Sequence, residues 1–192
     1  MSQPARVLEG ADVRRLIRHV GSHRHATRNH VMVLLSFKAG LRACEIAGLE
    51  WPMVLKPGGG VAPLMFVSGR ITKNGNARCV PIHPDLKSAL ASLKREGSHP
   101  RDGPVILSER GAAMTARSVV NWFRATYAEL DMPGCSSHSG RRSFITMAAR
   151  NVHRSGCSLR DVQLLAGHRS IETTERYIDG DTCAQRRLVA YI

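Results

Sequence analysis

The chain has 192 residues, 43% of them hydrophobic, which suits a globular domain with its own core. No apolar run approaches the roughly 20 residues of a membrane-spanning helix, and the N-terminus lacks the apolar segment of a signal peptide, so we expect a cytoplasmic protein without a membrane partner. The net charge of +13 comes mainly from arginine, whose guanidinium group matches phosphate oxygens, so nucleic acid is the expected partner and an inert basic surface the alternative.

The N-terminal part of the chain is predicted to be helical. An amphipathic helix begins near residues 8–12 and continues with apolar residues at helical spacing as far as Val20. Residues 25–40 predict a buried helix that ends at Gly40, and residues 41–51 predict another helix directly after that glycine.

The middle of the chain has a β-type pattern. Glycine-rich and Asn-Gly turns separate short apolar runs between Pro52 and Pro81. The Asn74-Gly75 pair, flanked by residues 70–72 and 77–80, is typical of a hairpin turn. We therefore expect a small antiparallel sheet near residues 53–81.

Helices are predicted again for the rest of the chain. Pro84 and Asp85 begin one that runs to about residue 95. Further helices are predicted over residues 115–130, 139–152, 158–167, 170–177 and 181–192. The predicted fold class is α+β, mainly α, with one domain over residues 1–192.

Cysteines and histidines give no support for a metal or a cofactor. The five cysteines form no C-x-x-C pair, and no H-E-x-x-H motif or H-x-H plus carboxylate set accompanies His23 and His25. The G-x-x-x-x-G-K-[ST] phosphate-binding loop is also missing from the sequence. We therefore expect neither a structural metal nor a nucleotide cofactor.

Two groups of residues before position 80 could carry chemistry. Arg42 opens a helix with Glu45 three residues later on the same face, so Glu45 could hold the guanidinium in position, or the two could form an ordinary surface ion pair. Lys73 at the expected hairpin tip is either a flexible arm that reaches a DNA groove or a solvated loop residue.

Two further groups lie in the C-terminal helices. His138 and Arg141 share a helix face, a pairing suited to phosphate binding and proton transfer, although an incidental histidine at a helix start gives the same pattern. His168 lies between a helix stop and a helix start. Tyr177 follows nine residues later in the polar run LLAGHRSIETTERYID, where an isolated tyrosine would be a half-exposed surface residue.

The chain order Arg, Lys, His-x-x-Arg, His, Tyr resembles the catalytic domain of the tyrosine recombinase (phage integrase) family. The resemblance runs from about residue 7 to residue 191. Its segments are GLRACEIAGLEW around Arg42, TKNGNARCVPI around Lys73, HSGRRSF around His138 and Arg141, and LLAGHRSIETTERYID around His168 and Tyr177. The last segment is the most specific and the lysine segment the least.

The resemblance implies a metal- and ATP-independent DNA strand transferase. Tyr177 would attack the scissile phosphodiester, forming a 3′-phosphotyrosyl link and releasing a 5′-hydroxyl. Arg42 and Arg141 would clamp the non-bridging oxygens with His168 as a further donor. His138 would be the base and Lys73 the acid.

The sequence departs from the family pattern at two positions and in its length. Gly140 replaces the usual leucine, and Arg142 replaces a common second histidine. Most members carry an N-terminal helical domain, whereas this match starts almost at Met1, as in the short fimbrial phase-variation invertases. We expect a catalytic domain alone, although a domain cut from a longer protein would look the same. Residues 181–192 would pass to a neighbouring protomer or pack on their own domain.

The resemblance implies double-stranded DNA as the partner, tetramer formation on paired sites and association with the nucleoid. Two other functions are compatible with the same fold. One is a non-catalytic DNA-binding regulator, although binding alone requires neither Tyr177 nor a proton-transfer pair. The other is a type IB topoisomerase-like nicking and closing enzyme, which would act as a monomer.

Overall fold

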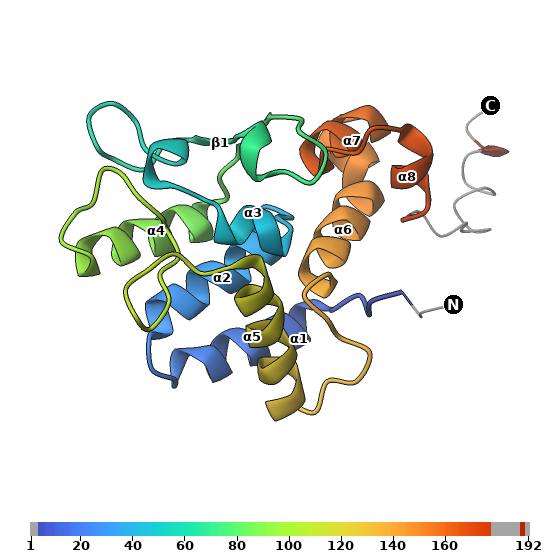
Figure 1. Cartoon of the computed structure of the whole chain (residues 1–192). Helices are drawn as coiled ribbons and strands as arrows, with labels where there is room; N and C mark the ends of the chain where they lie inside the picture. The colour runs from blue at the N-terminus through green and yellow to red at the C-terminus, as the bar shows by residue number, and fades with distance from the viewer. Residues whose placement is uncertain (1–3, 178–188, 191–192) are drawn as a thin grey trace.

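The computed structural model describes residues 4–177 and 189–190 (Figure 1). Its α-helices are α1 (Gly10–Gly21), α2 (Ala26–Lys38), α3 (Ala43–Ala47), α4 (Pro84–Glu96), α5 (Ala116–Glu129), α6 (Ser139–Ser155), α7 (Leu159–Ala166) and α8 (Ile171–Glu175). Two short 3-10 helices, η1 (Trp51–Met53) and η2 (Gly69–Ile71), and two strands, β1 (Leu64–Val67) and β2 (Arg78–Pro81), lie between α3 and α4. The predicted fold class, mainly helical with a small antiparallel sheet, is confirmed. In the described part of the chain, no helix is both long and apolar enough to cross a membrane.

Helix α2 lies at the centre of the fold. All of its residues from Val31 to Phe37 are buried, because it packs against α1, α4 and α6. It ends where predicted, since Gly40 adopts a φ of +63°, a left-handed conformation that few side chains tolerate. The chain then turns directly into α3, which positions Arg42.

The helix predicted over residues 41–51 is shorter than expected. Helix α3 stops at Ala47, and Pro52 belongs to η1. Gly48 is the residue after the helix, and a Cβ atom there would lie 2.6 Å from Cγ2 of Ile71, so this glycine lets the loop after β1 pack against the helix end. Local periodicity could not predict this contact.

The sheet is an antiparallel pair of β1 and β2, with Leu64 opposite Pro81 and Val67 opposite Arg78. The prediction that residues 70–72 form a strand beside the Asn74-Gly75 turn is wrong, because they belong to the end of η2 and the residue after it. Gly75 does adopt the positive φ of a turn residue, +74°. Its carbonyl packs so closely on Gly69 that any side chain there would overlap it. The turn therefore closes a ten-residue loop, 68–77, that carries Lys73.

The buried apolar residues form two clusters of unequal size. The principal core joins α1, α2, α3, α4 and α5 with both strands, and it includes Leu16, Leu34 and Phe123. The second core consists of the buried residues Ile145, Val162 and Ala166, with partly buried neighbours that include Tyr177. Figure 1 shows α6, α7 and α8 together at one side of the molecule.

Gly140 has a packing role in the contact between α6 and α2. A Cβ atom at this position would overlap the side chain of Ser36 and come within 2.9 Å of the Phe37 ring. The departure from the family's leucine therefore reflects a close helix approach. The helix predicted over residues 181–192 lies outside the described residues, apart from 189 and 190.

Candidate active site

Arg42 is held by a buried carboxylate at the start of α3. Its backbone N–H donates to Oε2 of Glu45 at 2.9 Å, and its Nη1 donates to Oε1 at 3.1 Å. Glu45 is fully buried, whereas the Arg42 side chain stays 18% exposed. The pair is therefore not an ordinary surface ion pair, because a buried carboxylate holds a side chain that remains partly exposed to solvent.

Arg78, at the start of β2, is a second partner of Glu45 that the sequence did not reveal. Its Nη1 and Nη2 donate to the two carboxylate oxygens at 2.8 and 2.9 Å, and its Nε donates to the carbonyl of Leu165 at 3.0 Å. Burial acts to raise the pKa of Glu45, but the hydrogen bonds and charge of Arg78, together with Arg42, outweigh it and lower that pKa. A carboxylate in an apolar helix signals that a cationic partner exists, but not which one.

Arg141 is buried at the junction of α6 with two other segments. Its guanidinium donates from Nη1 to the carbonyl of Gly40 and from Nη2 to that of Ala166, both at 2.6 Å. Burial and then the nearby charge of Arg42 lower the pKa of Arg141 to about 10, so it stays charged at neutral pH. Arg141 and Arg42 thus lie within electrostatic range of each other, although like charges repel. Such a pair is suited to an anionic ligand.

His168 and Tyr177 are in contact. Their rings stack with centroids 5.8 Å apart and an interplanar angle of 23°. His168 Nδ1 lies 2.9 Å from the Thr174 hydroxyl, and Nε2 of Gln163 donates to the His168 carbonyl at 3.0 Å. Burial, followed by the charges of Arg141 and neighbouring arginines, lowers the pKa of His168 to about 4. The imidazole is therefore neutral at neutral pH.

Arg142 also contacts the Tyr177 ring. Its guanidinium carbon lies 5.8 Å from the ring centroid, within the usual range of a cation–π contact. The family's second histidine is thus replaced by a residue that touches the expected nucleophile. The partly buried ring of Tyr177 is explained by these two contacts and by the second core.

His138 and Lys73 lie at the edge of this group. His138 precedes the first residue of α6, and partial burial, then the charges of Arg141, Arg42 and Lys73, lower its pKa. Lys73 is exposed in the 68–77 loop, where Nη2 of Arg169 donates to the carbonyl of the adjacent Asn74 at 3.0 Å. The structure thus brings Arg42, Arg141, His168 and Tyr177 together and leaves His138 and Lys73 within electrostatic range.

Comparison with known proteins shows the family of the chain. The sequence model of the Phage integrase family matches residues 6–182. The chain belongs to the phage integrase family. Similar relatives are the tyrosine recombinase XerC of Bradyrhizobium diazoefficiens, 30% identical over 85% of this chain and 49% of the relative, and that of Erythrobacter litoralis, 31% identical over 84% and 48%. The chain therefore spans about half the length of the curated relatives it matches.

Solved structures share the fold of this phage integrase family member. A Tn1549 transposon integrase in complex with a circular intermediate DNA matches with a TM-score of 0.80 at 17% identity, over 100% of this chain and 67% of that one. The XerA recombinase matches with a TM-score of 0.71 at 22% identity, over 100% and 66%. A lambda integrase dimer bound to a core site matches with a TM-score of 0.69 at 18% identity, over 93% and 61%.

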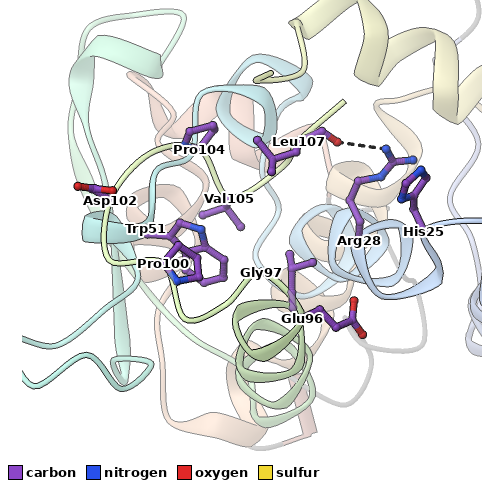
Figure 2. Close-up of a pocket in the computed structure, with 11 residues that line it drawn as sticks. His25, Arg28, Trp51, Glu96, Gly97, Pro100, Asp102, Pro104, Val105 and Leu107 are labelled. Carbon is purple, nitrogen blue, oxygen red and sulfur yellow. Dashed lines mark hydrogen bonds between the residues drawn. The ribbon is translucent and has the colours of Figure 1, made fainter. Parts of the chain in front are cut away.

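A pocket of about 340 Å³ lies elsewhere in this family member, between the start of α2, the end of α4 and residues 100–107 (Figure 2). Trp51 and Val105 line it, and Nη1 of Arg28 donates to the carbonyl of Leu107 at 3.1 Å across its edge. None of the six predicted site residues contributes to its wall. The candidate active site lies apart from this pocket, around the partly exposed side chain of Arg42.

Proposed function

We propose that the chain is the catalytic domain of a site-specific tyrosine recombinase, which cleaves and rejoins double-stranded DNA through a 3′-phosphotyrosyl intermediate. The observation that carries the proposal is the contact of Tyr177 with His168, within electrostatic range of Arg141, in a phage integrase family member. The relatives named as tyrosine recombinases and the DNA in several similar structures support it.

The two arginines are suited to clamp the scissile phosphate. Negative charge grows on the non-bridging oxygens as the nucleophile attacks, and preorganised donors aimed at that charge lower the barrier. Arg141 is preorganised by its two carbonyl partners and Arg42 by Glu45. Guanidinium groups bind phosphate with two parallel hydrogen bonds, so the pair supplies the positive charge that a metal ion supplies in other phosphoryl-transfer enzymes.

His168 acts as a further donor in this proposal. A neutral imidazole carries one proton, and if the Thr174 hydroxyl donates to Nδ1, that proton is on Nε2. Nε2–H can then donate to a phosphate oxygen. The low pKa of His168 keeps this tautomer neutral.

Proton transfer accompanies both the attack of Tyr177 on phosphorus and the departure of the 5′ oxygen. A phenol keeps its proton at neutral pH, so attack by Tyr177 needs a base, and His138 with its lowered pKa is the candidate. The Tyr177 Oη–phosphorus bond forms and the phosphorus–O5′ bond breaks. Lys73 would donate a proton to the departing 5′ oxygen. The phosphotyrosine retains the bond energy, so religation requires no nucleotide.

The partners and assembly follow from the same proposal. The net charge of +13 favours binding to double-stranded DNA, and recombination requires two sites and four protomers, hence a tetramer. The Tyr177 contacts favour use of the tyrosine in its own protomer. We also propose that protomers exchange residues 181–192. The protein would act in the cytoplasm, at the nucleoid.

Covalent trapping tests the proposed function. The protein is incubated with DNA from its own genetic neighbourhood, nicked so that the small 5′-hydroxyl fragment diffuses away and religation fails. We expect a denaturant-resistant protein–DNA adduct that Tyr177→Phe abolishes. Tyr127→Phe is the matched control, because the Tyr127 hydroxyl is buried without a hydrogen-bond partner in the described structure and its removal should leave the adduct intact. Persistence of the adduct in Tyr177→Phe would refute Tyr177 as the nucleophile.

A further inference from the structure

Three side chains without a part in the proposed reaction converge where α1 and α5 end. His19 lies in the last turn of α1, His23 lies just after it, and Glu129 is the last residue of α5. His19 Nε2 is 2.9 Å from Glu129 Oε2, and His23 Nε2 is 3.9 Å from the same oxygen. One ligand atom from each residue lies within 4.8 Å of the others.

The helix end itself brings the two imidazoles together. The turn continues past α1, since Ser22 N–H donates to the carbonyl of His19 and His23 N–H to that of Val20. Residues four apart therefore stay on one side, and the two rings meet edge to face with centroids 4.3 Å apart. The same spacing of two histidines on a helix holds zinc in other proteins.

We propose that His19, His23 and Glu129 form a binding site for a divalent transition-metal ion, Zn²⁺ by the type of its ligands. Imidazole nitrogen and carboxylate oxygen bind Zn²⁺ at about 2.0–2.2 Å, so ligand atoms of a tetrahedral site are about 3.4 Å apart. The distances of 2.9 and 3.9 Å lie on either side of that value, and small side-chain rotations would equalise them. Water would take the fourth position.

The ligand types select against other cations. Mg²⁺ and Ca²⁺ prefer sites made of oxygen atoms, whereas two imidazoles suit Zn²⁺, Cu²⁺ and Ni²⁺. A simple ion pair would need only one histidine beside Glu129, and it leaves the approach of the second to the same oxygen unexplained. The net charge of +13 repels any cation, so the affinity must come from coordination rather than from general attraction.

A bound ion would join two helices that are distant in sequence. The side chain of His19 is 23% exposed, that of His23 39% and that of Glu129 50%, so an ion can enter directly from solvent. The ion would tie the end of α1 to the end of α5, from which residues 130–137 lead to His138. A ligand that binds the folded state alone stabilises it.

The test uses untagged protein stripped of metal with a chelator. Zn²⁺ is titrated in competition with a chromogenic chelator, and Co²⁺ is added separately to record the visible absorption of a four-coordinate site. We expect one ion per chain with a micromolar or lower Kd. At a free Zn²⁺ concentration of about 100 times that Kd, the Tm should rise by roughly 5–10 °C.

Ligand variants locate the site. His23→Asn and Glu129→Gln should each weaken Zn²⁺ binding by about 100-fold or more, since even the loss of an outer-shell partner costs up to that factor. His99→Asn is the matched control, because His99 is exposed outside the cluster and its φ of +61° is tolerated by asparagine. The control should bind as the wild type does.

Three results would overturn the site. If Zn²⁺ binds no tighter than millimolar, the three side chains form only an ion pair. If His99→Asn weakens binding as much as His23→Asn does, the ion binds elsewhere. If millimolar Mg²⁺ displaces Zn²⁺, the proposed ligand preference is wrong. The proposal requires no DNA, so it stands or falls independently of the trapping experiment.

Discussion

The helices around α2 and the C-terminal helices α6–α8 are held in place by different forces. The first group shares the principal core, whereas α6, α7 and Tyr177, which follows α8, form the small second core. Guanidinium groups connect the two groups: Arg141 on α6 binds the carbonyls of Gly40 and Ala166, and Arg78 on β2 binds that of Leu165. The segment that carries Tyr177 is therefore attached in part through Arg141 and Arg78, in addition to the packing of α6 on α2 and of Leu165 on the principal core. Attachment of the nucleophile and assembly of the phosphate site are coupled.

The largest expected effect comes from breaking that connection at Arg141. Arg141→Ala removes a phosphate donor and leaves two buried carbonyls unpaired, so adduct formation should slow by roughly 100- to 1000-fold or more. DNA retention should change little, because roughly 6–10 phosphate contacts typically share the binding. Adduct formation is followed on gels and binding by fluorescence anisotropy. Loss of binding together with cleavage would contradict the clamp role.

Removal of the Glu45 charge tests whether Arg78 helps to hold α7 on the rest of the fold. Glu45→Gln should lower the free energy of unfolding by about 3–5 kcal/mol, because it leaves Arg78 without a buried counter-charge. Denaturation in urea measures the loss, and hydrogen exchange in α7 should accelerate because Arg78 also holds the Leu165 carbonyl. Glu50→Gln on the exposed surface is the control and should stay within about 0.5 kcal/mol of the wild type. Unchanged exchange in α7 would show that the two helix groups are joined by apolar packing instead.

Substitution of Arg169 should slow cleavage by a smaller factor, because Arg169 acts through Lys73, the proposed acid. Because Arg169 binds the Asn74 carbonyl, Arg169→Ala should loosen the Lys73 loop and slow cleavage by about tenfold, a fraction of what an acid contributes. A substrate with sulfur in place of the 5′ oxygen needs no proton on departure, so it should restore the rate in both Arg169→Ala and Lys73→Ala. Arg124→Ala, an exposed arginine on α5, should be neutral. A defect in Arg169→Ala that persists with the sulfur substrate would exclude action through Lys73.

The smallest expected effect is on acid stability. His168 has a pKa of about 4 in the folded protein against about 6.5 unfolded, so between these values the unfolded chain binds a proton that the folded chain does not. Stability should therefore fall as pH drops from 6.5 to 4, with no contribution above that window. Urea unfolding at pH 7, 6, 5 and 4 should give a shallower decline for His168→Gln. Equal slopes for variant and wild type would place the acid sensitivity in another group, of which His138 is the next candidate.

The sequence by itself determined the features that depend on near neighbours. Gly40 and Gly167 end their helices with φ of +63° and +65°, and Ser158 and Asp161 form the predicted capping box. The Arg42–Glu45 contact was also predictable, since three residues along a helix start separate the two side chains. The family segments indicated the six site residues, whose catalytic roles remain predictions for the experiments above.

The tertiary structure decided what depends on distant partners. Residues 70–72 lie outside the sheet, where Ile71 packs against Gly48 of a distant helix end, and Glu45 is paired with Arg78 from a strand 33 residues away. The carbonyl partners of Arg141 and the meeting of His19 with Glu129, 110 residues apart, have no local signature either. Backbone preferences act over a few residues, so a sequence records them directly. The pairing of buried charges depends on which segments the packed core brings together.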